Sequence, residues 1–351
     1  MIKAAQNRRT LRADTITLAH GSGGKAMRDL IEDVFVGGFD NKHLDTLEDQ
    51  ARFDLTDLSA LGGRIAMTTD SYVVDPLFFP GGDIGKLAVT GTVNDLAVSG
   101  AKPLYLTCGM IIEEGFAVEE LRRIVASMKS TADAAGVAIV TGDTKVVHKG
   151  AADKLFINTA GIGIIPSNIN ITATRAKPGD VVLINGFIGD HGAAIVDARG
   201  EMSLEHTINS DCQPLNDLIK CMLEICPDIH CMRDATRGGV ATVLNEFAEL
   251  SSTGIMLNES TLPIRTEVRG MCEILGLDPL YLANEGKLVA IVPAEHANDL
   301  LTAMKSHPAG KDSAIVGEVI QEHVGRVILQ TGFGGNRIVD MLVGEQLPRI
   351  C

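Results

Sequence analysis

The chain has 351 residues, a length typical of two domains of about 100–200 residues each. Hydrophobic residues make up 45% of the chain and charged residues 22%, which is typical of a globular protein and excludes an intrinsically disordered one. The formal net charge of −14 disfavours nucleic acid and membranes as partners, because so acidic a chain repels their phosphate groups.

The cysteines and the N-terminus indicate a reducing compartment. The chain has 7 cysteines and no Cys-x-x-Cys pair, so neither a disulfide framework nor a zinc site is favoured. No apolar run approaches the roughly 18 residues of a membrane span, and the first 15 residues lack the apolar stretch of a signal peptide. We therefore expect a cytoplasmic protein with an N-terminal extension over residues 1–17.

Hydrophobic periodicity predicts a first domain over residues 18–166. Its predicted helices are 27–36, 84–99 and 118–135, the last ending at Gly136. Its predicted strands are a short one that starts near Arg64 and ends at Asp70, followed by 104–112, 137–140 and 155–165.

A stretch rich in Asn, Thr and Pro, residues 166–178, predicts a linker, and we place a second domain at 177–335. Its predicted strands are 180–184, 254–258, 286–292, 313–319 and 324–330, and its predicted helices are 214–226, 240–250, 265–275 and 294–305, with one more starting near Gly192. Strands and helices mix without strict alternation, which favours two α+β domains. Residues 336–351 then form a C-terminal tail beyond the last strand.

Two glycine-rich turns precede predicted helices and could bind phosphate. Gly23, Gly24 and Lys25 lie in the first, which lacks the residues of a P-loop, and Arg237, Gly238 and Gly239 form the second. Glycine lets backbone N–H groups approach phosphate oxygens, and a helix start favours an anion. The alternative is that each turn only starts a helix.

Five aspartates lie at predicted strand ends or turns and could bind Mg²⁺: Asp70, Asp83, Asp95, Asp143 and Asp234. Mg²⁺ takes one or two carboxylates together with water and phosphate oxygens. Each aspartate alone is better explained as a helix cap or Asx turn, but the five together favour a metal–phosphate site.

The chain ends in a cysteine, Cys351, after a glycine-rich stretch. A terminal residue is seldom held by core packing, so its thiol is either accidental or a nucleophile that a tail delivers.

Several motifs resemble the HypE family of hydrogenase maturation proteins from residue 20 to the end. They are His20-Gly-Ser-Gly-Gly-Lys25, Thr69-Asp-Ser-Tyr72, Asp75-Pro-Leu-Phe-Phe-Pro-Gly-Gly82, Asn94-Asp-Leu-Ala-Val-Ser-Gly-Ala101, Thr141-Gly-Asp-Thr-Lys145, Arg233-Asp-Ala-Thr-Arg-Gly-Gly239, Ala283-Asn-Glu-Gly-Lys287 and Pro348-Arg-Ile-Cys351. That family is similar in fold to aminoimidazole ribonucleotide synthetase (PurM-like), selenophosphate synthetase and thiamine-phosphate kinase.

The resemblance implies a two-domain PurM-like fold with a mobile tail, and a homodimer that binds ATP and Mg²⁺ at the dimer cleft. It implies a carbamoyl dehydratase, in which the partner HypF carbamoylates Cys351 and ATP drives dehydration to a thiocyanate. The cyanide then passes to iron on a HypC–HypD complex for [NiFe]-hydrogenase. By the same resemblance Glu285 and Lys145 handle protons, and Asn94 and Thr144 bind ATP.

Two alternatives stay open at this point. The first is a selenophosphate synthetase or small-molecule kinase of the same superfamily, although the first glycine-rich loop has no cysteine. The second is a non-catalytic carrier or scaffold for which Cys351 is only an attachment point.

Overall fold

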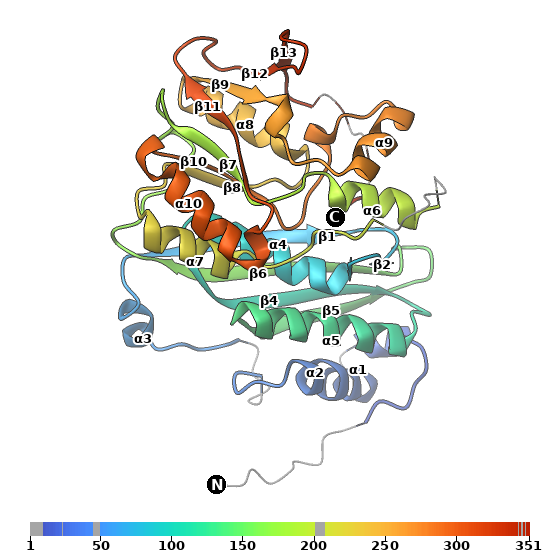
Figure 1. The fold of residues 1–351 in the computed structure, drawn as a ribbon. Coiled ribbons are helices and arrows are strands. Elements are labelled where there is room, and N and C mark those ends of the chain that lie inside the picture. Colours follow the sequence, from blue (N-terminus) through green and yellow to red (C-terminus); the bar gives the residue numbers. More distant parts are fainter. Residues whose placement is uncertain are drawn as a thin grey trace.

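The structure is a computed structural model that describes residues 10–22, 24–44, 50–200, 208–342, 344, 347 and 349–351. Two sheets with their helices are stacked, and the C-terminus lies between them (Figure 1). Among the described residues, no helix is both long and apolar enough to cross a lipid bilayer.

The first sheet has the strand order β1-β6-β4-β5. The strands are β1 (Arg64–Tyr72), β4 (Lys102–Glu113), β5 (Ala138–Val147) and β6 (Leu155–Ile165). β5 is longer than the predicted strand at 137–140, because it pairs in parallel with β4 as far as Val147. The motif Thr141–Lys145 therefore lies inside the strand and not after its end.

One face of this sheet is covered by helices. The helix α4 (Ile84–Val98) contacts β1, β6 and β4, and α5 (Val118–Ala135) packs against α4. The opposite face, which we call the open face, carries Ile65, Met67 and Ile111, whose side chains are exposed. The N-terminal helices are α1 (Lys25–Leu30), a π-helical stretch (Ile31–Val36) and α2 (Gly37–Phe39), and a short helix α3 (Leu55–Ser59) precedes β1.

Part of the expected N-terminal extension belongs to this domain. Ile16 is fully buried, its N–H donates to the Phe116 carbonyl, and Thr15 bridges Ala117. Residues 10–17 are thus packed on the fold, which corrects the prediction for this part of the segment, while residues 1–9 lie outside the described part.

The second sheet has the order β13-β12-β9-β11-β7-β10-β8. Its strands are β7 (Val181–Ile184), β8 (Cys231–Asp234), β9 (Gly254–Asn258), β10 (Leu288–Val292), β11 (Ala314–Ile320), β12 (Val327–Gln330) and β13 (Asn336–Val339). β13 corrects the expected tail at 336–351, because its four residues pair with β12.

Alternate residues of the central strands pack into two cores. The core on one face contains α7 (Asn216–Ile225) and α10 (Ala294–Ser306), and the core on the other contains α8 (Gly239–Leu250). The helices α6 (Asp190–Ala198) and α9 (Thr266–Leu275) share a smaller cluster. Helices on both faces of a mixed sheet confirm the α+β prediction.

Candidate functional site

Carboxylates from both sheets meet where β1, α4 and β8 approach one another. Tyr72 donates a hydrogen bond from its hydroxyl to Asp70 Oδ2 (3.2 Å), and Thr68 donates to Asp95 Oδ2 (2.7 Å). α4, which carries Asp95, contacts β8, which ends at Asp234. We call Asp70, Asp95, Asp234 and Glu285 the acidic cluster.

Burial and mutual repulsion disfavour the charged forms in this cluster. Burial and the Asp70 charge raise the pKa of Asp95 to about 6. Burial and the charges of Asp95 and Asp70 raise the pKa of Asp234 to about 8. Burial and the charges of Asp234 and Asp211 raise the pKa of Glu285 well above its usual value. Groups perturbed in this way concentrate at functional sites and favour binding of a cation.

The cluster is not a ready-made metal cage. Within the described part of the chain, no three His, Cys, Asp or Glu side chains gather closely enough to hold a metal ion. Mg²⁺ needs only one or two carboxylates when phosphate oxygens and water supply the rest. The donor set thus fits a metal that arrives with a phosphate group.

Glu285 is buried and fixed through its backbone. Asp211 accepts hydrogen bonds from the N–H groups of Glu285 (3.0 Å) and Gly286 (3.2 Å), and its carboxylate forms a buried ion pair with Lys287 (3.1 Å). The Oε1 atom of Glu285 is buried without a hydrogen-bond partner. An unpaired buried acceptor is costly, so this carboxyl group is available to a ligand.

The end of the chain docks at the end of β1, the strand that carries Asp70. Val73 N–H donates to the Cys351 carbonyl (3.1 Å), Asp75 N–H donates to the Arg349 carbonyl (3.3 Å), and Ile350 is buried. These contacts place the terminal residues against the segment that follows β1. Figure 1 marks the C-terminus there, beside β1 and α6.

Cys351 shares a cavity of about 330 Å³ with the second glycine-rich turn. Arg237 and Gly238 line it, and the turn follows directly from Asp234. Gly238 and Gly239 have φ values of 75° and 61°, and a Cβ on Gly239 would lie 2.4 Å from the Leu280 carbonyl oxygen. This turn therefore requires glycine, and its exposed Arg237 lines the same cavity as Cys351.

Asp143 and Lys145 lie elsewhere. Lys145 pairs with Ile111, so it lies on the open face, and Asp143 lies two residues before it in the same strand. Both side chains are exposed and form an ion pair (2.6 Å). Asp70 pairs with the buried Thr159 and so lies on the opposite face of the sheet. Within one copy, Asp143 and Lys145 therefore lie on the opposite face of the first sheet from Asp70.

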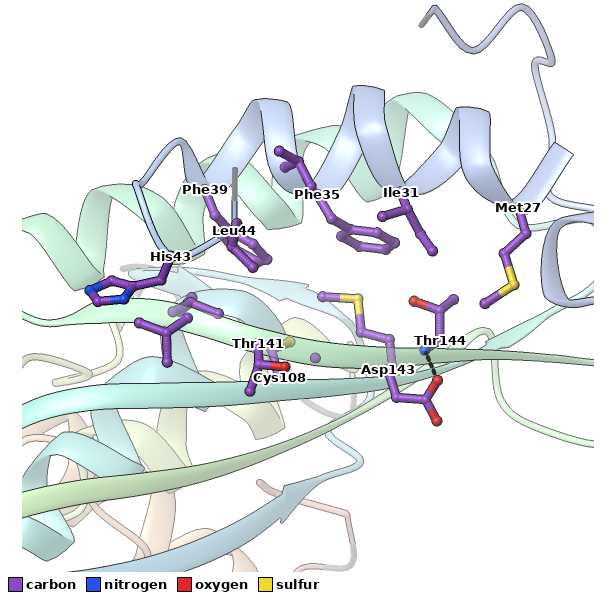
Figure 2. Close-up of a pocket in the computed structure, with 15 residues that line it drawn as sticks. Met27, Ile31, Phe35, Phe39, His43, Leu44, Cys108, Thr141, Asp143 and Thr144 are labelled. Atoms are coloured by element: carbon purple, nitrogen blue, oxygen red, sulfur yellow. Dashed lines mark hydrogen bonds between the residues drawn. The ribbon is translucent and has the colours of Figure 1, made fainter. Parts of the chain in front are cut away.

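A second cavity of about 440 Å³ separates the N-terminal helices from β5 (Figure 2). Phe35 and Ile31 point into it from above, Thr144 faces it from the strand, and the Asp143 carboxylate lies on the far side of the strand. Gly24 and Lys25 are exposed at the start of α1, while Gly23 lies outside the described residues.

Two predicted site residues have structural roles. Asp83 caps α4, because its Oδ1 accepts from the N–H groups of Gly85 (2.7 Å) and Lys86 (3.0 Å), so a metal would have only Oδ2. Asn94 is buried and links α4 to the second domain: it accepts from Leu215 N–H (2.8 Å) and donates to the Gln213 carbonyl (3.2 Å). Both ends of its amide are therefore engaged by backbone groups of the same chain.

The sequence reasoning missed Tyr72 and Asp211. Tyr72 is buried, and burial and the Asp70 charge raise the pKa of its hydroxyl. Asp211 orients the backbone of Glu285 from 74 residues away. Nothing in the sequence near Asp211 points to this contact, because it depends on long-range packing.

Two family models match the two halves of the chain. The N-terminal domain of AIR synthase related proteins matches residues 48–165, and their C-terminal domain matches residues 177–330.

Individual relatives and solved structures identify a narrower family than these two domain models do. The carbamoyl dehydratase HypE of Rhodobacter capsulatus is 56% identical over 341 residues, which are 97% of this chain and 99% of the relative. A crystal structure of HypE in complex with ATP has a TM-score of 0.91 at 50% identity and covers 96% of this chain and 100% of its own. HypE in a HypE–HypF complex has a TM-score of 0.78 at 51% identity and covers 89% and 99% of the two chains. The chain therefore belongs to the HypE family, within the AIR synthase related (PurM-like) proteins.

Proposed function

We propose that this chain is a carbamoyl dehydratase that uses ATP to dehydrate a carbamoyl group on the thiol of Cys351. The product is a thiocyanate, which supplies the cyanide ligand of the [NiFe]-hydrogenase iron. The observation that carries this proposal is the position of Cys351, docked against residues 73–75 in a cavity lined by Arg237 and by Ala283, two residues before the buried Glu285.

Dehydration removes the carbamoyl oxygen and both protons of its nitrogen. ATP, when bound, converts that oxygen into a phosphate leaving group. Glu285 accepts one nitrogen proton, because its raised pKa makes its ionised carboxylate a stronger base than an ordinary glutamate, and the departing phosphate takes the other. Arg237 offsets negative charge that develops on the transferred phosphoryl group.

Two parts of the chain are suited to hold ATP and Mg²⁺. One or two of Asp70, Asp95 and Asp234 would supply the metal carboxylates, because a cation relieves the repulsion in the acidic cluster. The backbone of Gly238 and Gly239 and the exposed start of α1 at Gly24 and Lys25 would bind phosphate. Gly23 belongs to the same glycine-rich motif as Gly24 and Lys25. Thr144 lines the cavity between the N-terminal helices and β5. Asp83 and Asn94 fit less well, because their side chains are engaged elsewhere.

A homodimer would complete the site. The open face exposes Met67 (73%) and Ile65 (59%), and apolar side chains on a covered sheet face would be protected from water. Lys145 and Asp143 lie on that face and could meet a Glu285 or a metal only in a second copy. We propose that each site combines the acidic cluster of one copy with Lys145 and Asp143 of the other.

Two protein partners follow from the chemistry. HypF would deliver the carbamoyl group, since a solved relative forms a HypE–HypF complex. A HypC–HypD complex would receive the cyanide on iron.

Labelled carbamoyl phosphate tests the proposal. With HypF, ATP and Mg²⁺ present, the chain should retain label and form thiocyanate. Cys351→Ser should do neither, while the matched variant Cys221→Ser should behave like the parent, because Cys221 lies on α7 away from the tail. Label retention by Cys351→Ser would contradict the proposal.

A further inference from the structure

The last carbonyl group before Cys351 is bound by a buried histidine. Nε2 of His191 lies 2.7 Å from the Ile350 carbonyl oxygen, and His191 has no exposed surface. Its other ring nitrogen, Nδ1, lies 2.8 Å from the hydroxyl oxygen of Ser210. The ring of Phe79 packs edge-on against the imidazole at 5.5 Å. Both nitrogens and the ring plane are therefore fixed.

The hydrogen-bond partners determine which ring nitrogen carries the proton. A carbonyl oxygen can only accept, so Nε2–H of His191 donates to Ile350. Ser210 Oγ already accepts from Cys212 N–H (3.1 Å), and its own proton is free to donate to Nδ1. Burial also lowers the pKa of His191, which agrees with a neutral ring. The Ile350 carbonyl thus selects the tautomer, and the Ser210 hydroxyl complements it by donating to Nδ1.

The helix start that carries His191 is also bonded to the segment that carries Glu285. Gly189 N–H donates to Asn284 Oδ1 (2.7 Å), and Gly192 N–H donates to the Ala283 carbonyl (3.1 Å). One rigid turn of α6 therefore holds both the tail and the residues that immediately precede Glu285.

A second side chain of the same helix region holds the tail to the first domain. Arg199, which follows α6, donates from Nη2 to the Arg349 carbonyl (2.9 Å) and from Nε to the Asp75 carbonyl (2.9 Å). Arg349 in turn donates from Nε to the Val73 carbonyl (3.1 Å). These contacts fix the backbone of the tail, so they do not depend on what is attached to the thiol of Cys351.

We propose that His191 is a positioning residue, which holds the docked tail in register with the Glu285 segment so that the group on Cys351 meets that carboxylate. This inference rests on the proposed function of Cys351. The hydrogen bond from His191 to the Ile350 carbonyl, which we call the latch, can nevertheless be measured without catalysis. Ser210 supports this hydrogen bond by holding the Nδ1 side of the ring, and Arg199 anchors Arg349, the residue before Ile350.

The rate at which iodoacetamide alkylates Cys351, followed by peptide mapping of the full chain, measures the latch. His191→Ala should raise this rate about tenfold, the change expected when one net hydrogen bond is lost. His191→Gln should stay close to the parent, because the glutamine amide can donate from the position of Nε2. Cys212, two residues after Ser210 and buried, reports local unfolding in the same samples.

Three results would overturn the latch: equal alkylation of Cys351 in His191→Ala and the parent, a parallel rise at Cys212, or failure of His191→Gln to rescue. A second readout links the latch to the reaction. His191→Ala should accept the carbamoyl group at the parental rate and dehydrate it slowly, with recovery in His191→Gln. Glu285→Gln should also dehydrate slowly but keep parental alkylation. Glu285→Gln could dehydrate at the parental rate while His191→Ala raises the alkylation rate of Cys351. That result would contradict the role of Glu285 as base and would still support the latch.

Discussion

Asp70 and Asp143 occupy the two faces of the first sheet, and their surroundings differ accordingly. On the α4 face, Asp70 lies among carboxyl groups whose pKa values are raised by burial and repulsion. On the open face, Asp143 is exposed, and the hydrogen bond from Lys145 holds its pKa below the usual value. The same residue type therefore has opposite electrostatic surroundings on the two faces of one sheet. Binding of a cation would relieve the repulsion among the carboxyl groups around Asp70, whereas the charge of Asp143 is already balanced by Lys145.

The largest expected effect comes from substitution of Glu285, which belongs to the buried acidic cluster around Asp70. Glu285→Gln should slow dehydration of carbamoylated Cys351 by about 10²–10⁴-fold, because it removes the general base without changing the volume. Rapid-quench measurement of thiocyanate checks this. Carbamoyl acceptance should stay normal, and a normal dehydration rate would remove Glu285 from the role of base.

Mixing two inactive variants tests whether the two faces act together across a dimer. Glu285→Gln and Lys145→Ala should each have little activity as homodimers. In a random mixture, half of the dimers are hybrids with one intact site of two, so about a quarter of the parental activity should return. No recovery in verified hybrids would show that Lys145 does not act from a second copy.

The pH dependence of stability separates the two aspartate groups. The folded pKa values of Asp95 (about 6) and Asp234 (about 8) exceed the ordinary value of 3.8. The stability linked to them is therefore complete below about pH 4 and is lost as the pH rises through 6 and 8. In the presence of a chelator, the unfolding free energy, and with it the melting temperature, should therefore fall as the pH rises from 6 to 8.

Variants and Mg²⁺ with ATP sharpen this prediction. Asp234→Asn should flatten the melting profile between pH 6 and 8, while Asp143→Asn should leave its slope unchanged. Mg²⁺ with ATP should stabilise the parent more at pH 8 than at pH 6, since a bound cation favours the ionised carboxylates. If the melting temperature of Asp234→Asn changes with pH as in the parent, the acidic cluster is not the cause of the loss of stability between pH 6 and 8.

The smallest expected effect is at Asp83. Asp83→Ala should cost about 0.5–2 kcal/mol of stability through loss of the helix cap, and Asp83→Ser should recover most of it. Thermal unfolding of both variants beside an ATP turnover assay checks this. If both variants unfold like the parent but lose ATP turnover, Asp83 acts on the metal and not as a cap.

Local pattern was enough to predict most elements of the fold. The helix Val118–Ala135 and the strand Leu155–Ile165 have the predicted limits, because each combines clear periodicity with a clear stop such as Gly136. β5 and β13 were mispredicted because both are defined by pairing with another strand, over residues that are weakly apolar by themselves. Pairing between distant segments leaves little trace in a short window.

The site was less predictable than the fold. The motifs identified Asp95, Asp234 and Glu285, but which face of a strand each aspartate occupies depends on register, and a shift of one residue reverses it. The tail contacts join residues 276 positions apart, as between Arg349 and Val73, so no motif could show them. His191 and Ser210 were missed for the same reason.

Intact mass of the parent chain over time, with peptide mapping at Cys351, tests the central claim most directly. The chain would be incubated with carbamoyl phosphate, HypF, ATP and Mg²⁺. We predict a gain of one carbamoyl group at Cys351, followed by the loss of one water only when ATP is present. A carbamoyl group that forms at Cys351 and stays hydrated with ATP, or a tail that stays unmodified beside active HypF, would contradict the account.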